Sequence, residues 1–385
     1  MKILLVSSNS SSTGGGELFF IKIARHFIER GEYVTIAYSD NNQFDGLAKS
    51  ASDIGCKVLR YPYERVYDRR FRSLELFFVG RSKGVSSISL DSYDVVHVSQ
   101  QNIEDGIDIV ATLGQICPER MVVTIHVVEW LNRLGQRFGT LRQVYPKYVY
   151  NLLHENVRFA FLSNYAQQLF SEMFCVQPRN SRVIYNGAER SLSTGNQIKY
   201  REELGINSTD FVIGSIGRLE EEKNYKTLLK AFASVQQNIG KTRLLLVGDG
   251  SQRNELTVQA RNLGVGDNLI ITGWVPDPSP FLDIMDTFVL PSWFEGFPFA
   301  LVEALISEKV CLASSIPPHV ECLSNETTLL FSPANYIDLG NALMRVAKKD
   351  IHTFEAARRA IDNAHSKFTM DIMINELLEF YRVSI

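Results

Sequence analysis

Short apolar runs recur along the chain, and each is followed by a stretch in which apolar residues recur at helical spacing. The run Lys2–Ser7 is an example, because Leu18, Ile21 and Phe27 follow it at the spacing of one helix face. This alternation predicts βα units and a parallel sheet. Further strands of the first half are predicted at Tyr33–Tyr38, Lys57–Leu59, Val95–Val98, Met121–Ile125, Arg158–Leu162 and Arg182–Tyr185.

A Ser- and Thr-rich stretch, Arg190–Tyr200, separates this series from a second one and reads as a linker. The second series predicts strands at Phe211–Ile216, Arg243–Val247, Asn268–Thr272, Thr287–Leu290, Val310–Ala313 and Leu329–Phe331. Helices are predicted between them at Tyr225–Asn238, Gln252–Leu263 and Phe299–Ile306, and a last helix at Met370–Tyr381. The simplest architecture is α/β, with two doubly wound domains in tandem.

Composition narrows the function classes. The chain has 385 residues, 45% of them hydrophobic and 22% charged, which is typical of a soluble globular protein and long enough for two domains. A formal net charge of −3 argues against a nucleic-acid partner, and no apolar run reaches membrane-spanning length. The scattered cysteines, five in number, fit reduced thiols, and we expect a cytoplasmic protein. One segment, Arg60–Lys83, is basic and rich in aromatic residues. It is a candidate contact for an anionic membrane surface or a phosphate-bearing substrate, and a solvated loop and helix face explains it equally well.

Ligand-binding chemistry follows several predicted strands. In the first half a glycine loop, Gly14-Gly15-Gly16, follows the first strand, and His126 follows the strand that ends at Ile125. His126 is as well explained by a structural role as by a functional one. In the second half Gly217 and Arg218 come directly after a strand, with Lys223 five residues beyond Arg218. Two cations at a strand end are able to flank a diphosphate, although a surface charge run is the alternative.

Two carboxylates mark the fourth strand of the second half. Beyond Leu290 the chain carries Glu295 and Gly296, and Pro298 suits the first turn of a helix that contains Glu303. A helix N-terminus suits a phosphate, and carboxylates accept hydrogen bonds from a polyhydroxylated ligand. Glycines also end two neighbouring strands, at Gly248 and Gly273.

In this order the motifs resemble family 4 of the retaining glycosyltransferases, which have the two-domain GT-B fold. The motifs span nearly the whole chain: Gly14-Gly15-Gly16-Glu17, Thr124-Ile125-His126, Ile184-Tyr185-Asn186-Gly187, Gly217-Arg218 with Lys223, Gly248-Asp249-Gly250, Gly273-Trp274-Val275, the Glu-x7-Glu pair Glu295 and Glu303, and Phe368-Thr369. The resemblance implies an acceptor-side domain of residues 1–190 with the helix 370–385, and a donor-binding domain of residues 191–369.

The resemblance also implies roles for single residues. Arg218 and Lys223 would neutralise the donor diphosphate, Glu303 would bind the ribose, and Glu295 would bind sugar hydroxyls near the anomeric carbon. His126 would lie near the reacting face of the sugar. The remaining implied contacts to base, sugar and diphosphate involve Gly15, Gly16, Gly217, Gly248, Gly273, Trp274, Val275, Gly296, Phe297 and the backbone N–H groups at Leu301 and Val302.

The activity implied is transfer of a sugar, with retained anomeric configuration, from a nucleotide-diphosphate sugar to a glycan or lipid-linked saccharide in bacterial surface polysaccharide synthesis. The donor expected is a UDP-sugar, with a GDP-sugar as the alternative. No tightly bound cofactor and no metal are expected, since the two cations and a helix N-terminus supply the charge stabilisation. Peripheral contact with the inner face of an anionic membrane is a further expectation.

Three departures from the family pattern concern the second half. Asn224 follows Lys223 where glycine is frequent, Glu308 stands where a glycine often ends the helix of Glu303, and Pro317-Pro318 replace a glycine pair in a loop expected at Ser314–Glu321. In the first half Val127 replaces an aspartate after His126, and Glu129 is a possible substitute. Two other functions stay open: an epimerase of the same fold and a non-catalytic nucleotide-sugar-binding scaffold.

Overall fold

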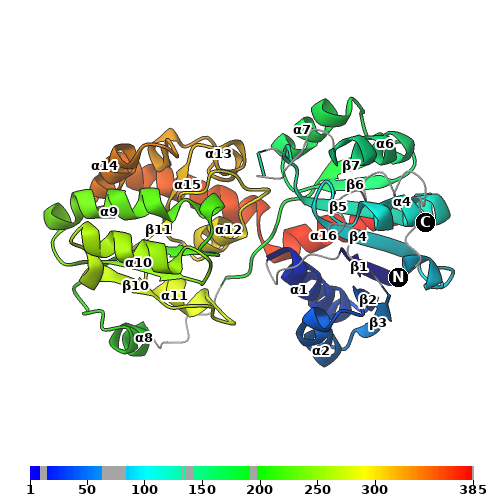
Figure 1. Cartoon of the computed structure of the whole chain (residues 1–385), viewed down its shortest axis with the longest axis horizontal. Helices are drawn as coiled ribbons and strands as arrows, with labels where there is room; N and C mark the ends of the chain where they lie inside the picture. Colours follow the sequence, from blue (N-terminus) through cyan, green and yellow to red (C-terminus); the bar gives the residue numbers. More distant parts are fainter. Residues whose placement is uncertain (9–14, 63–83, 132, 135–141, 191–196, 384–385) are drawn as a thin grey trace. The chain divides into compact units, whose positions relative to one another are not determined.

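The computed structural model describes the whole chain except residues 9–14, 63–83, 132, 135–141, 191–196 and 384–385. It forms two compact units (Figure 1), one made of Met1–Tyr185 with Met373–Ile385 and the other of Asn186–Ile372. The basic segment predicted to touch a membrane, Arg60–Lys83, lies outside the described residues after its first positions. The same holds for Gly14 of the glycine loop.

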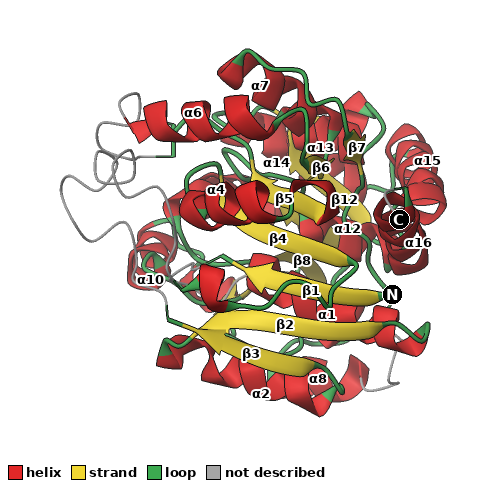
Figure 2. Cartoon of the chain, turned by 90° about the vertical axis from the view of Figure 1, so that its right-hand side faces the viewer, coloured by secondary structure: helices red, strands yellow, loops and turns green. Residues whose placement is uncertain are grey.

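The first unit is built on a parallel sheet of seven strands in the order β3-β2-β1-β4-β5-β6-β7 (Figure 2). Its strands are β1 (Lys2–Ser7), β2 (Tyr33–Ser39), β3 (Lys57–Tyr61), β4 (Val95–Asn102), β5 (Met121–Val127), β6 (Arg158–Phe161) and β7 (Ser181–Val183). Its described helices are α1 (Gly15–Glu29), α2 (Asp45–Asp53), α4 (Ile107–Ile116), α6 (Val144–Leu153) and α7 (Asn164–Phe174).

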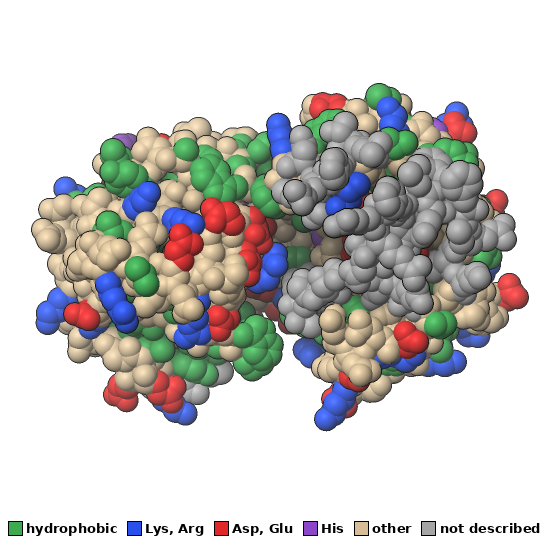
Figure 3. Space-filling view, viewed as in Figure 1, with side chains coloured by type: hydrophobic (Ala, Val, Ile, Leu, Met, Phe, Trp, Pro, Cys, Tyr) green, Lys and Arg blue, Asp and Glu red, His purple; other side chains and the backbone are tan. Residues whose placement is uncertain are grey.

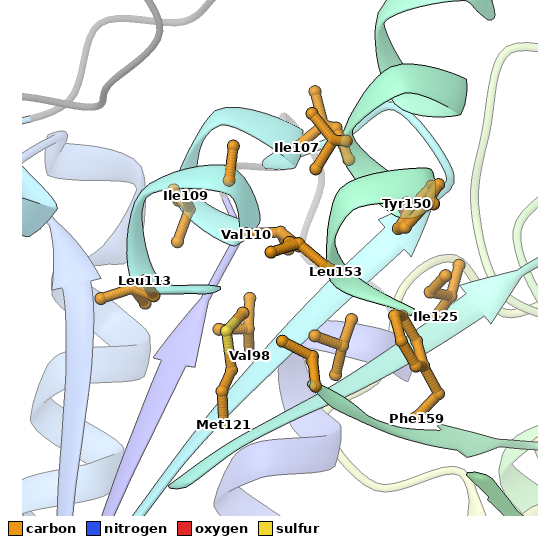
Figure 4. Packing of buried hydrophobic residues seen from close by; sticks show 14 of the residues in the cluster. Val98, Ile107, Ile109, Val110, Leu113, Met121, Ile125, Tyr150, Leu153 and Phe159 are labelled. Atoms are coloured by element: carbon orange, nitrogen blue, oxygen red, sulfur yellow. The ribbon is translucent and has the colours of Figure 1, made fainter. Parts of the chain in front are cut away.

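Burial explains why the strands of this sheet have continuous apolar sequences. Helices cover both faces, so β4 and β5 are buried almost throughout and carry no alternation of polar and apolar positions. In Figure 4 side chains of α4 such as Val110 meet Val98 of the sheet, and Leu153 of α6 joins the same cluster.

The C-terminal helix α16 (Met370–Arg382) packs on the first unit. The Tyr381 hydroxyl lies 2.5 Å from Nδ1 of His97, whose Nε2 lies 2.8 Å from the Thr124 hydroxyl. Arg158 Nη1 donates to the carbonyl oxygens of Phe380 and Tyr381, at 2.6 and 3.1 Å, and so satisfies carbonyls at the end of the helix.

The second unit has a parallel sheet of six strands in the order β10-β9-β8-β11-β12-β13. Its strands are β8 (Phe211–Ile216), β9 (Thr242–Val247), β10 (Leu269–Ile271), β11 (Thr287–Leu290), β12 (Val310–Ser314) and β13 (Leu330–Phe331). Its helices in the described ranges are α8 (Gln197–Glu203), α9 (Tyr225–Ile239), α10 (Arg253–Asn262), α11 (Ser279–Asp283), α12 (Phe299–Ile306), α13 (Pro317–Cys322), α14 (Tyr336–Ala347) and α15 (Ile351–Lys367).

Both sheets reverse their direction of growth in the middle. The chain builds outward from β8 to β10 and then returns to place β11 on the other side of β8. Connections from the carboxyl ends of β8 and β11 therefore diverge to opposite faces, and this switch point is where open α/β sheets bind ligands. The prediction of two doubly wound α/β domains is confirmed.

Candidate active site

The turn after β8 depends on two glycines that lie backbone to backbone. A Cβ on Gly248 would lie 2.1 Å from the carbonyl oxygen of Gly217, so no other residue fits there without a shift of the main chain. Gly217 donates its N–H to the carbonyl of Val247 at 3.0 Å. The predicted motifs at the ends of β8 and β9 thus meet, and they aim the following residue, Arg218, outward, where 55% of its side chain is exposed.

Lys223 ends the short 3-10 turn Glu221–Lys223, and the next residue decides the direction of the chain. Asn224 has φ 55° and ψ 34°, a left-handed conformation that favours glycine and that asparagine tolerates. Its side-chain amide donates to the carbonyls of Pro291 and Pro333, at 3.1 and 2.8 Å. The departure from glycine at this position therefore ties the turn after β8 to the loop after β11.

The same two loops are joined by an ion pair. The Lys223 ammonium donates to Oε1 of Glu295 at 2.5 Å, and the Ser292 hydroxyl donates to the same oxygen at 2.7 Å. Burial raises the pKa of Glu295, but Lys223, His319 and Ser292 together outweigh it and hold that pKa below its ordinary value. Glu295 is therefore a carboxylate at neutral pH, held at the switch point by a cation and a hydroxyl.

Arg218 has a carboxylate partner of its own. Its Nη2 lies 2.7 Å from Oε1 of Glu222, which the sequence placed only in a charge run. The backbone carbonyl of Glu222 also accepts the N–H of Trp293 at 2.8 Å. Both cations predicted to hold a diphosphate are thus matched by carboxylates in the ligand-free protein, and Figure 3 shows acidic and basic side chains gathered together on this unit.

Helix α12 places Glu303 one turn inside its N-terminus, where the side chain is half-buried. Pro298 precedes the helix as its cap residue, with φ −82° and ψ 94°, and is not in the first turn as predicted. Its carbonyl accepts the N–H groups of Leu301 and Val302, each at 3.1 Å. These two N–H groups, predicted to meet the sugar and phosphates, therefore already take part in the first hydrogen bonds of the helix.

Phe297 and Gly296 are buried in the loop before α12. The Phe297 carbonyl accepts a hydrogen bond from the side-chain amide of Asn186 at 3.3 Å, and its ring lies 5.3 Å from that of Phe368. Ala188 and Thr369 form a parallel bridge beside them. The predicted motifs at Asn186-Gly187 and Phe368-Thr369 therefore support the loop that carries Glu295.

The predicted base-binding turn follows β10. Gly273 has φ 79° and forms an antiparallel bridge with Gly248, while the Trp274 side chain is 72% exposed and Val275 is half-buried. Sequence reasoning missed Arg253, whose Nη1 pairs with Asp249 at 2.8 Å and lies within 3.2 Å of the position of a Cβ on Gly273. No sequence signal connected a helix residue to this turn.

In the first unit, His126 lies inside β5, one residue before its end, and does not follow the strand as predicted. The strand is longer because β4 extends to Asn102, which pairs with Val127. His126 is 6% exposed, its Nε2 lies 2.8 Å from the Ser99 hydroxyl, and burial lowers its pKa to about 4.

Glu129 accepts the N–H of Trp130 at 2.8 Å and pairs with Arg133 at 3.5 Å. Gly15 and Gly16 are the first residues of α1.

The expected loop at Ser314–Glu321 is helical from Pro317 onward, and Ser314 is the last residue of β12. Pro317 and Pro318 occupy the start of α13, where proline is tolerated, and they fix the helix that carries His319. His319 is fully buried, and burial lowers its pKa to about 4. Neither this histidine nor Ser292 was among the predicted site residues.

Comparison with known proteins identifies the arrangement. Residues 196–367 match the family model of the group 1 glycosyl transferases. A galactosyltransferase of Escherichia coli, UDP-Gal:alpha-D-GlcNAc-diphosphoundecaprenol alpha-1,3-galactosyltransferase, is 29% identical over 270 residues, which cover 66% of this chain and 67% of the relative. Over this part of its length the chain resembles the group 1 glycosyl transferases.

Solved structures show the same GT-B fold. Anabaena Alr3699/HepE, solved in complex with UDP, superposes with a TM-score of 0.77 at 20% identity, covering 98% of this chain and 99% of that chain. A glycosyltransferase from Rickettsia africae gives the same TM-score at 18% identity and covers 100% of this chain and 98% of that chain. The comparisons confirm the resemblance inferred from the motifs and the GT-B fold.

Two features are absent from the part of the chain that the structure describes. No helix in it is long and apolar enough to cross a bilayer. Within the same residues, no group of three or more His, Cys, Asp and Glu side chains is placed to hold a metal ion.

Proposed function

We propose that the protein is a glycosyltransferase that moves a sugar from a UDP-sugar to a glycan or lipid-linked saccharide, with retention at the anomeric carbon and without a metal ion. The observation that carries the proposal is the meeting of Lys223 and Glu295 at the β8–β11 switch point, with Arg218 beside them. A binding site for a diphosphate sugar needs cations for the phosphates and a carboxylate for the hydroxyls, and this switch point supplies both.

The predicted site residues other than Leu301 and Val302 each have a role in this proposal. Arg218 and Lys223 bind the diphosphate, Glu303 the ribose hydroxyls and Glu295 the hydroxyls of the transferred sugar. The remaining assigned contacts to the base, sugar and diphosphate are Gly15, Gly16, Gly217, Gly248, Gly273, Trp274, Val275, Gly296 and Phe297. His126 of the first unit acts near the reacting carbon. In the transfer the bond from the anomeric carbon to the diphosphate oxygen breaks, the acceptor oxygen takes its place on the same face, and the acceptor proton passes to the diphosphate.

The names of two relatives support the substrate classes. The E. coli relative is named for UDP-galactose and a lipid diphosphate acceptor. A Campylobacter jejuni relative, 27% identical over 34% of this chain, is named for an acceptor linked to undecaprenol. We therefore place the reaction in bacterial surface polysaccharide synthesis, in the cytoplasm, with the enzyme bound peripherally to an anionic membrane where a lipid-linked acceptor lies.

A thermal-shift screen with UDP-, GDP- and ADP-sugars, in EDTA and then in magnesium, tests donor and metal together, because a ligand of the folded state raises the melting temperature. The expected result is a shift with a UDP-sugar that EDTA leaves unchanged. A shift that requires magnesium overturns the metal-free proposal, and no shift from any donor refutes the donor site.

Acceptor dependence tests the reaction itself. Release of UDP should require a saccharide acceptor, and nuclear magnetic resonance of the product should show the anomeric configuration of the donor. UDP release without acceptor would favour an epimerase. Arg218→Ala and Glu303→Ala should abolish turnover in folded protein, and wild-type rates in both would refute the site.

A further inference from the structure

A buried chain of hydrogen bonds connects His319 to the loop that carries Glu295. Nδ1 of His319 lies 3.0 Å from the Ser314 carbonyl and 3.1 Å from its hydroxyl. That hydroxyl donates to the carbonyl of Ser292 at 2.6 Å, and the Ser292 hydroxyl donates to Glu295. His319, Ser314 and Ser292 are all 0% exposed, so the packing fixes the imidazole relative to the carboxylate.

These contacts determine which nitrogen carries hydrogen. A carbonyl oxygen only accepts, so Nδ1 of His319 is the N–H nitrogen and Nε2 is left with a lone pair. Nε2 is buried and makes no hydrogen bond to any residue that the structure describes. A buried acceptor without a partner is costly, and in a native site it calls for an explanation.

The charges that act on His319 are those of the proposed donor site. Glu295 favours the protonated imidazole, Lys223 disfavours it, and burial keeps the ring neutral in the ligand-free protein. Glu321 and Cys322, which follow His319 in the sequence, are the titratable neighbours on α13 itself. The opposing charges of Glu295 and Lys223 therefore influence the protonation state of this histidine.

A diphosphate would change that balance. Arg218 and Lys223 are already matched by Glu222 and Glu295, so the added anion brings negative charge that the two cations do not offset in full. Once the Lys223 ammonium is shared with a phosphate, Glu295 loses part of its counter-charge. The imidazole of His319, which interacts electrostatically with both Glu295 and Lys223, is a neutral group able to gain a positive charge.

We propose that His319 is the positioning residue of Glu295: when the diphosphate of the donor engages Lys223, Nε2 of His319 takes up a proton from water and keeps the carboxylate in place to bind the sugar. This inference rests on the proposed donor site. The proton replaces the counter-charge that Lys223 gives to the phosphate, and no bond to His319 forms in the transfer itself.

Calorimetric titration with UDP-glucose in buffers of different ionisation enthalpy counts the protons taken up on binding. UDP-glucose suits the test because its diphosphate is esterified at both ends and does not titrate near neutrality. At a pH of about 6 we expect about half a proton or more per donor bound, and binding that strengthens by about threefold to tenfold between pH of about 7.5 and 5.5.

His319→Asn is the decisive variant, because its amide keeps a donor at the place of Nδ1 and removes Nε2. It should bind UDP-glucose without proton uptake and with little dependence on pH. His97→Gln controls for a buried histidine outside the proposed donor site and should retain the uptake.

The outcomes separate the two proposals. Binding to the wild-type enzyme with no dependence on the buffer, or equal uptake by His319→Asn, overturns the role of His319 while the donor site stands. No binding heat from any nucleotide sugar refutes the donor site and this inference with it.

Discussion

The Lys223 ammonium lies 2.5 Å from a carboxylate oxygen of Glu295, although 72 residues separate the two in the chain. The pair joins the loops that leave β8 and β11, and only 17% and 15% of the two side chains are exposed. A buried pair of this kind adds little net stability, but it costs several kcal/mol to break on one side. It therefore holds the site in one arrangement before a ligand arrives.

Lys223→Ala should lower the free energy of unfolding of the second unit by about 2–4 kcal/mol, because it leaves the Glu295 carboxylate buried without its cation. Lys226→Ala is the matched control: Lys226 is 30% exposed and pairs with Glu221 and Glu255, so a loss below about 1 kcal/mol is expected. Urea denaturation in a Trp130→Phe background reports this unit through Trp274 and Trp293. Equal losses in the two variants would contradict a special role of the buried pair.

Glu222→Gln should tighten UDP-glucose binding by about twofold to fivefold, because it removes the carboxylate that competes with the diphosphate for Arg218. The gain is modest, since 55% of the Arg218 side chain is exposed and its ion pair is screened by solvent. Glu221→Gln removes a neighbouring charge that accepts hydrogen bonds from Lys226 and Gln252, and it should change UDP-glucose binding less than Glu222→Gln does. Calorimetry of both variants decides, and weaker binding by Glu222→Gln would show that Glu222 orients Arg218 for the ligand.

The sequence predicted what depends on local pattern. Strand Phe211–Ile216 and helix Phe299–Ile306 have the predicted bounds, because buried parallel strands are continuous apolar runs and short helices begin after a proline. The extension of β5 through His126 was not predictable, since it follows from pairing with the distant strand β4. The hydrogen bonds from His319 to the Ser314 carbonyl and from the Ser314 hydroxyl to the Ser292 carbonyl likewise depend on the tertiary fold. Residue types at strand ends thus indicated a site, and only the fold specified the partners.

Stability of the first unit should fall as the pH drops from about 6.5 to about 5, through His97 and His126 alike. Burial lowers the pKa of His97 to about 3 and that of His126 to about 4, so the folded chain keeps both neutral while the unfolded chain binds a proton at each below about 6.5. The stabilising contribution is complete above the unfolded pKa and is lost toward the folded one. The expected loss is about 1.4 kcal/mol per pH unit for each histidine.

His97→Gln should reduce the change of unfolding free energy with pH by the contribution of about one bound proton. It should also lower stability at neutral pH, because the contacts to Tyr381 and Thr124 are lost. Substitution of His352, whose side chain is 81% exposed, is the control and should leave the slope unchanged. Urea titrations followed by Trp130 fluorescence measure both. A slope that His97→Gln leaves unaltered would assign the pH dependence to other groups.

Glu308→Gly should stabilise the second unit by about 0.5–1 kcal/mol. Glu308 follows the cap residue of α12 with φ 58°, a left-handed conformation in which glycine carries no steric penalty. Its carboxylate pairs with Arg190 at 3.1 Å, but both side chains are about half exposed, so that loss is small. Glu308→Gln separates the two effects, because it removes the charge and keeps the Cβ, and it should leave stability within about 0.5 kcal/mol of the wild type. If both substitutions destabilise equally, the ion pair outweighs the backbone strain, and glutamate at this position serves to hold Arg190 at the start of the unit.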